Sequence, residues 1–170
     1  MKQVIKNNEF ASFYKNYINL APNLEIVEAL KNSKIEVLEI FKNLTEEKWI
    51  FRYAENKWTP KEMFLHIIDT ERIMAYRALR IARNDLTPLP GFEENDYVPV
   101  SDANERSVES LIKEYKLQRK STMSLFKNLP QKSLENTGIA SNNAISVRAL
   151  GYIVAGHEKH HTNILKERYL

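Results

Sequence analysis

Residues 59–84 read TPKEMFLHIIDTERIMAYRALRIARN, and this stretch decides the fold class. Thr59 has the residue type of a helix N-cap, Pro60 suits the first helical position, and Glu62 suits a reciprocal capping box. No further proline and no glycine interrupts the stretch before the TPLPG tract at 87–91, which ends any continuation. The pattern predicts one long helix.

Three further segments carry apolar residues at steps of three and four, the spacing of one helix face. They cover residues 24–44, residues 107–129, and a last segment that runs from about residue 146 almost to the end. No segment alternates like a strand over a useful length. We therefore predict an all-α fold, a four-helix bundle forming a single domain over residues 1–170. The first 20 residues are expected to pack on its outside.

The connection between the second and third helices, residues 85–104, is long for a helical bundle. It contains Phe92, Tyr97 and a cluster of acidic side chains at Glu93, Glu94 and Asp96. A long ordered loop of this kind can be a lid over a site or a crossover between distant helices, and either role fits the sequence.

The composition is that of an ordinary globular protein, with 43% hydrophobic and 28% charged residues. No apolar run approaches the roughly 18 residues that a membrane span needs, and the N-terminus lacks a signal-like apolar stretch. We therefore expect a cytoplasmic protein that does not bind a membrane. The chain has no cysteine, which excludes thiolate ligands and a cysteine nucleophile. The net charge is only +3, and the lysines and arginines are interleaved with acidic residues. Because no basic block is present, no nucleic-acid partner is expected.

Three of the four histidines lie in GHEKHH, residues 156–161. His157 and His161 are four positions apart, which separates them by about 40° on a helix, so both imidazoles can reach one ion. Aliphatic residues share this face, which should point into the bundle. Buried imidazoles are costly unless their nitrogens find partners, either one shared metal or separate hydrogen bonds. His160 projects to the other side and is interpreted as a surface or supporting residue.

His66 lies on a polar stripe of the second predicted helix. Such a stripe is usually a solvent-exposed face, and His66 alone favours that interpretation. Together with the pair on the last helix, however, a third imidazole completes the ligand set of a catalytic metal site, which keeps a position open. His66, His157 and His161 are therefore the predicted ligands of one divalent metal ion. Zn or Ni is expected first, and Fe and Mn are also compatible.

Several separated motifs resemble those of the DinB/YfiT-like superfamily. They are KWTPKE at 57–62, HIIDTER at 66–72, YRALR at 76–80, LPGF at 89–92, GHEKHH at 156–161 and ERYL at 167–170. The resemblance implies a four-helix bundle whose metal is held by one histidine of the second helix and a pair from the last, which correspond to His66, His157 and His161. It also implies a homodimer.

Three functions remain open for such a site, each with a small molecule as partner. Relatives in this superfamily act as S-transferases, so the first interpretation is transfer of a low-molecular-weight thiol such as bacillithiol or mycothiol, held as the thiolate. The alternative is a hydrolase that uses metal-activated water. The third is a non-catalytic bundle that binds a metal or a small molecule.

Four further side chains near His66 on the helical stripe are candidates for roles in catalysis or binding. Glu62 and Asp69 could act as acid or base, although Glu62 is also explained by helix capping and Asp69 by orienting His66 or pairing with an arginine. Arg77 and Arg80 could bind carboxylates of the substrate, and the alternative for both is a surface ion pair.

Overall fold

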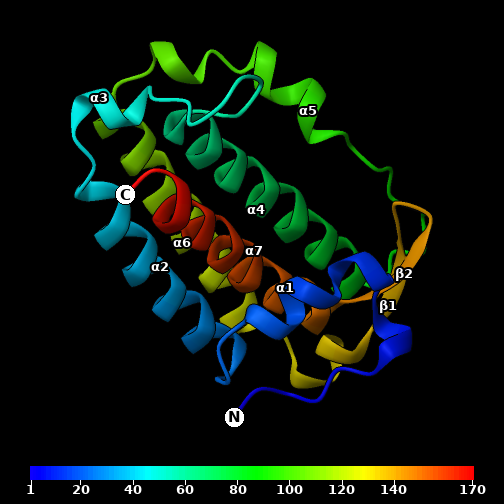
Figure 1. Cartoon of the computed structure of the whole chain (residues 1–170). Coiled ribbons are helices and arrows are strands. Elements are labelled where there is room, and N and C mark those ends of the chain that lie inside the picture. Colours follow the sequence, from blue (N-terminus) through cyan, green and yellow to red (C-terminus); the bar gives the residue numbers. More distant parts are fainter.

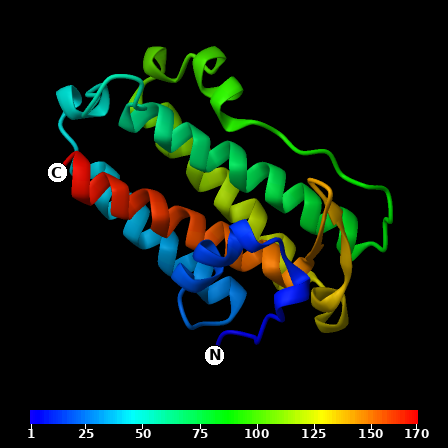
Figure 2. The ribbon, with the colours of Figure 1, turned by 45° about the vertical axis from the view of Figure 1, so that its right-hand side comes forward.

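The computed structural model describes all 170 residues and contains four long helices, α2 (Ile26–Lys42), α4 (Pro60–Ala82), α6 (Val108–Asn128) and α7 (Val147–Arg168). Helix α7 packs against α2 and α4, and α6 packs against the same two helices on the other side (Figures 1 and 2). The four-helix bundle is confirmed, and each helix begins and ends within two residues of its predicted bounds. None of these helices combines the length and the apolar character that crossing a bilayer requires.

Three of the four long helices, α4, α6 and α7, begin where the sequence supplies a capping side chain. The Thr59 hydroxyl accepts a hydrogen bond from the backbone N–H of Glu62, and the Glu62 carboxylate accepts one from the N–H of Thr59 at 2.7 Å. Ser107 and Ser146 cap α6 and α7 in the same way, each accepting from the N–H three residues later. Caps of this kind stabilise a helix by about 1 kcal/mol each, because they satisfy N–H groups that have no partner within the helix.

The N-terminal segment covers α7 on one side. Its short helix α1 (Lys15–Leu20) packs along α7, as the blue ribbon in Figure 1 shows. Tyr14 and Ile18 of this segment are 8% and 7% exposed and belong to the hydrophobic core. The segment thus packs on the outside of the four-helix bundle, as expected, and buries Tyr14 and Ile18 against it.

A β-hairpin that the sequence did not predict precedes α7. Strands β1 (Thr137–Ala140) and β2 (Asn143–Ser146) pair antiparallel. The turn residues Ser141 and Asn142 have positive φ angles of 49° and 62°, the conformation favoured in two-residue hairpin turns. Strands of four residues are too short to show a clear alternation, so the prediction of no strand was wrong here, while the predominantly helical class holds.

The long connection after α4 is anchored to this hairpin. Leu89 donates a backbone hydrogen bond to Ile139 at 2.9 Å and accepts one from Ser141 at 3.0 Å. From there the chain returns along α4 to the short helix α5 (Glu94–Tyr97), as the green ribbon in Figure 2 shows. The remaining short elements are α3 (Glu46–Trp49) and five 3₁₀ turns at Asn7–Glu9, Ser12–Tyr14, Val98–Val100, Ala103–Glu105 and Gln131–Glu135.

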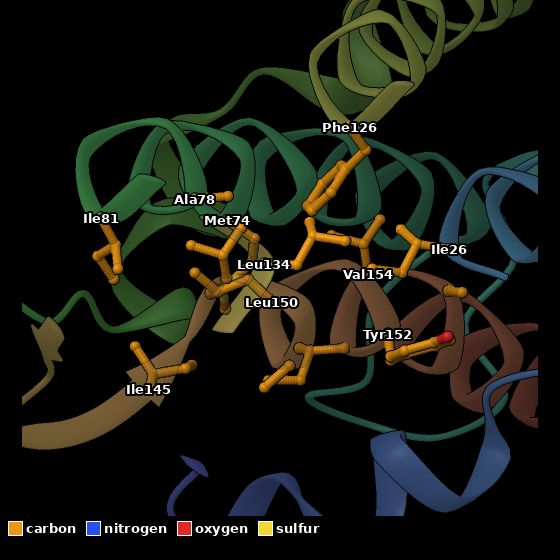
Figure 3. Packing of buried hydrophobic residues seen from close by; sticks show 14 of the residues in the cluster. Ile26, Met74, Ala78, Ile81, Phe126, Leu134, Ile145, Leu150, Tyr152 and Val154 are labelled. Atoms are coloured by element: carbon orange, nitrogen blue, oxygen red, sulfur yellow. The ribbon is translucent and has the colours of Figure 1, made fainter. Parts of the chain in front are cut away.

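The core consists of two hydrophobic clusters, one at each end of the bundle. The cluster nearer the hairpin includes Phe126 of α6 and Leu150 of α7, which Figure 3 shows in close packing with side chains from α4. The other cluster is built around Phe41, Phe64 and Trp49, whose rings contact one another. This division leaves polar side chains of α4 and α7 facing each other in the middle of the bundle.

Candidate metal centre

The three predicted histidines come together between α4 and α7. The Nε2 atom of His157 lies 3.0 Å from Nε2 of His66 and 3.0 Å from Nε2 of His161. The ligand atoms of all three residues lie within 4.8 Å of one another. The three side chains are only 9%, 5% and 7% exposed, in the order His66, His157 and His161.

The donor set fits a metal better than a set of hydrogen bonds. A neutral imidazole nitrogen carries either one hydrogen or one lone pair, so Nε2 of His157 can make only one good hydrogen bond. It nevertheless has two imidazole nitrogens at 3.0 Å. One cation on which the three lone pairs converge satisfies all three nitrogens at once. The residues present therefore fit a single divalent ion.

The environment keeps these imidazoles neutral, which is the form that binds metals. Burial, assisted by the neighbouring His160, lowers the pKa of His66 from 6.5 to about 4. Burial, with smaller contributions from the adjacent imidazoles, lowers the pKa of His157 and of His161 well below that of a free histidine. No proton has to be removed from these rings near neutral pH before an ion can bind.

Aromatic rings hold the histidines in place from two sides. The Trp58 ring lies 4.8 Å from the His66 ring and is stacked at 6.4 Å from the His161 ring. The Tyr17 ring meets His157 edge-on at 5.3 Å. His160 also contacts Tyr17, at 5.5 Å, and stays outside the convergent cluster, as its position on the helix predicted.

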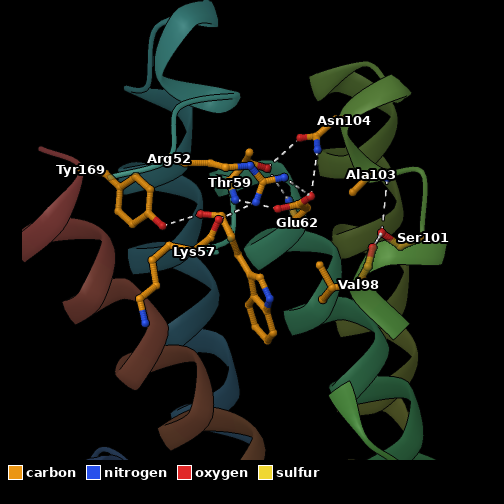
Figure 4. Close-up of polar contacts among 10 residues, drawn as sticks. Arg52, Lys57, Thr59, Glu62, Val98, Ser101, Ala103, Asn104 and Tyr169 are labelled. Carbon is orange, nitrogen blue, oxygen red and sulfur yellow. Dashed lines mark hydrogen bonds and ion pairs between the residues drawn. The ribbon is translucent and has the colours of Figure 1, made fainter. Parts of the chain in front are cut away.

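Glu62 is engaged at the start of α4. Its Oε1 accepts hydrogen bonds from Arg52 at 2.7 Å and from Asn104 at 2.9 Å, and its Oε2 serves the capping box with Thr59 (Figure 4). Asn104 comes from the end of the long connection, so the carboxylate ties three segments together. The capping box accounts for Oε2, and Oε1 is engaged by Arg52 and Asn104.

Asp69 and Arg80 lie in ion pairs near the surface. Asp69 accepts a hydrogen bond from Arg72 at 2.9 Å, and burial raises the pKa of Asp69 despite this neighbour. Arg80 pairs with Asp85, which is the surface ion pair considered as the alternative to substrate binding.

Arg77 does not form the surface ion pair considered as the alternative to substrate binding. Its side chain is 2% exposed and forms no ion pair. It donates instead to the Pro90 carbonyl at 2.7 Å and to the Ser141 hydroxyl at 3.1 Å, and its guanidinium lies 5.7 Å from the centre of the Phe92 ring. Arg77 thus joins α4 to the long connection and the hairpin turn.

Two cavities reach the histidine cluster. One, which we call the His157 cavity, has a volume of about 300 Å³ and is lined by His66 and His157 together with aromatic side chains and Glu94. The other, the His161 cavity, measures about 220 Å³ and is lined by His161, Lys57 and Asn95 among others. A narrow crevice beside His66 is also lined by Glu94. Helix α5 therefore contributes to all three spaces around the cluster.

Apart from His66 and His157, the sequence reasoning assigned no role in a site to the residues that line the His157 cavity. Tyr14 and Tyr17 lie in the N-terminal segment, which carries no motif, and Glu94 was noted only as one of three acidic residues in the connection. Their grouping depends on contacts between segments far apart in the chain. The amphipathic pattern of 12–20 was the one available hint that this segment packs on the bundle.

The comparisons with known proteins agree with this fold. The family model of the DinB superfamily matches residues 29–165, which include all three histidines. A protein of Oceanobacillus iheyensis, whose name proposes a metal-dependent hydrolase, is 28% identical over 130 residues, covering 75% of this chain and 74% of the relative. The solved structure of YfiT from Bacillus subtilis, inferred to be a metal-dependent hydrolase with an unusual four-helix bundle topology, superposes with a TM-score of 0.69. That match has 12% sequence identity and covers 97% of this chain and 93% of the other.

Proposed function

The chain belongs to the DinB superfamily, and we propose that it is a metal-dependent hydrolase that acts on a small molecule in the His157 cavity. His66, His157 and His161 would hold the ion. Three neutral imidazoles are the ligand set of catalytic rather than sealed structural sites, because they leave a coordination position for substrate or water.

One observation carries this proposal: three buried imidazole nitrogens from two helices converge beside an accessible cavity. A structural site would be closed on all sides, whereas His66 and His157 here line a space of about 300 Å³. That volume is at the lower end of the range for small-molecule sites. The names given to the Oceanobacillus protein and to YfiT are consistent with a hydrolase.

The chemistry divides between the ion and the chain. A divalent ion bound at the three histidines would supply Lewis acidity and lower the pKa of a water molecule. Burial raises the pKa of Tyr14 and of Tyr17, so both phenols stay protonated and can donate hydrogen bonds into the cavity. The surrounding aromatic rings exclude bulk water and thereby strengthen polar interactions with a bound substrate.

Thiol S-transfer is the second candidate, and the His161 cavity favours it. A transferase needs room for two reactants, and this cavity gives access to the cluster at His161, the histidine that does not line the His157 cavity. Lys57 and two asparagine side chains, Asn56 and Asn95, line it and are suited to the polar groups of a small thiol. A thiol reacts there as its thiolate, the nucleophilic form.

The test is a substrate panel with the protein loaded separately with Zn, Ni and Mn. Ester, amide and phosphate substrates are assayed for hydrolysis, and bacillithiol, mycothiol and other small thiols are assayed with a reactive electrophile for conjugation. We expect hydrolysis of at least one class, abolished by a chelator and by His161→Ala and retained in His160→Ala. Conjugation without hydrolysis would establish the second candidate, and turnover that survives both the chelator and His161→Ala would refute a metal-dependent reaction.

A further inference from the structure

We propose that the His157 cavity selects small molecules that carry a protonated amine, and that Glu94 is the residue that binds this amine. The inference rests on the proposed function only in that the same cavity would hold the substrate. It assigns a charge to that substrate, which neither the fold nor the three histidines specify.

Glu94 is a carboxylate without a partner in this cavity. Its side chain takes part in no ion pair and accepts no hydrogen bond, and it is the one acidic residue that lines the cavity. The adjacent Glu93, by contrast, accepts hydrogen bonds from the backbone and side chain of Asn95. A half-buried carboxylate next to aromatic rings loses part of its hydration. A charge-assisted hydrogen bond from a ligand ammonium group would compensate for this loss.

The aromatic residues of the cavity suit the same ligand. Phe13, Tyr14 and Tyr17 come from the N-terminal segment, and Phe92 comes from the connection that carries Glu94. Glu94 lines the same cavity as both tyrosines. Faces of aromatic rings attract cations, and rings combined with a carboxylate form a common recognition site for ammonium groups.

No lysine or arginine side chain lines the cavity beside Glu94. Arg77 is buried in the wall, where its guanidinium donates to Pro90 and Ser141, and its charge also acts on Tyr14. In the metal-free protein, Glu94 is the one acidic side chain that lines the cavity, so an amine would find a counter-charge there that an anionic ligand would not.

Glu94 also lies where it can orient a ligand toward the ion. It lines both the His157 cavity and the narrow crevice beside His66. The two spaces share three lining residues, Glu94, Phe92 and His66. An amine held at Glu94 leaves the remainder of the molecule in the space that reaches His66 and His157. The carboxylate thus acts as a specificity-determining residue for the proposed hydrolase.

The test compares three ligands of the same shape and different charge: benzylammonium, benzyl alcohol and phenylacetate. Affinities are measured by isothermal titration calorimetry and ligand-observed NMR on the full-length chain after metal removal, so that no probe can bind through the ion. We expect benzylammonium to bind at least about tenfold more tightly than the other two. Glu94→Gln should remove this preference, and Asp96→Asn should preserve it.

Asp96 is a matched control because it lies on the same short helix, is exposed, and does not line the cavity. Equal or tighter binding of phenylacetate, an unchanged preference in Glu94→Gln, or an equal loss in Asp96→Asn would each overturn the proposal. Unchanged circular dichroism of Glu94→Gln would exclude misfolding as the cause of a loss.

The two proposals can fail separately. If the amine preference is present and depends on Glu94 while no substrate is hydrolysed, the cavity assignment stands and the hydrolase function fails. If hydrolysis depends on the three histidines while the probes show no preference for a cation, the hydrolase stands and the assignment of an amine fails.

Discussion

Gly156 lies directly against the backbone carbonyl of Tyr17, and a Cβ atom on residue 156 would stand 1.7 Å from that oxygen. Helix α1 can therefore approach α7 only because this position has no side chain. The contact places Tyr17 beside His157, the next residue of α7, at a ring separation of 5.3 Å. Gly156 thus sets the distance between helix α1, which contributes Tyr17 to the cavity, and the histidine cluster.

Gly156→Ala should displace α1 from α7, because the carbonyl belongs to the backbone and cannot rotate away. We expect the free energy of unfolding to fall by about 2 kcal/mol, the effect of overpacking outweighing the gain in helix propensity. Hydrogen exchange of residues 12–20 should accelerate. Gly151→Ala is the control, because a Cβ there would meet the side chains of Ile26 and Phe126 and not the segment 12–20. Unchanged exchange in Gly156→Ala would contradict this explanation.

Metal content should depend on all three clustered histidines. The protein, purified without a metal-binding tag, should contain about one equivalent of divalent metal by elemental analysis, and His66→Ala or His157→Ala should lose it. Removing one of the three predicted ligands should weaken Zn binding at least about 100-fold. The loss of a residue that only hydrogen-bonds to a metal ligand already lowers metal affinity by about 10- to 100-fold. His160→Ala should keep its metal. A wild-type protein that binds no Zn, Ni or Mn would refute the site.

The buried guanidinium of Arg119 should be essential for stability. It lies 2.8 Å from Glu71 and 2.6 Å from Glu158, and all three side chains are at most 1% exposed. Arg119→Met would leave two buried carboxylates without a counter-ion, so the free energy of unfolding should fall by about 3–5 kcal/mol in urea titrations. Lys120→Met, at the exposed neighbouring position, should change it by less than about 0.5 kcal/mol. A similarly small loss for Arg119→Met would show that the carboxylates are neutral or hydrated.

Acid should weaken the attachment of the N-terminal segment. The hydrogen bond with Arg148 lowers the pKa of Glu9 from 4.5 to about 2. A depressed pKa means that this stabilisation is complete above pH 4.5 and is lost as the pH falls toward 2. At neutral pH, the free energy of unfolding of the wild type should be larger than that of Glu9→Gln by about 1–2 kcal/mol. This difference between the two proteins should vanish near pH 2. A difference that stays constant with pH would exclude the ion pair as its origin.

The helix cap at Thr59 should matter for stability and not for metal binding. Thr59→Ala removes the acceptor for the Glu62 N–H, so the free energy of unfolding should fall by about 1 kcal/mol. Metal content should remain that of the wild type. A variant that loses its metal would show that the start of α4 also positions His66.

The sequence alone determined the four helices and the pairing of His157 with His161 on one helix face, because both depend on local spacing. Apolar residues at steps of three and four define a helix face, and Thr59, Pro60 and Glu62 mark where α4 begins. His157 and His161 share a face because they are one helical turn apart, whatever the rest of the chain does. The hairpin at 137–146 escaped prediction, because its strands are too short for a periodic signal.

Only the tertiary structure decided which polar side chains meet. His66 joins the pair on α7 because α4 and α7 pack against each other, and no local pattern distinguishes it from a solvent-exposed histidine. Arg77 and Arg80 lie one turn apart on the same helix, yet Arg77 is buried against Pro90 and Ser141 while Arg80 pairs with Asp85 at the surface. Helical periodicity specifies the direction of a side chain, whereas its partners come from segments whose position depends on the packing of the whole chain.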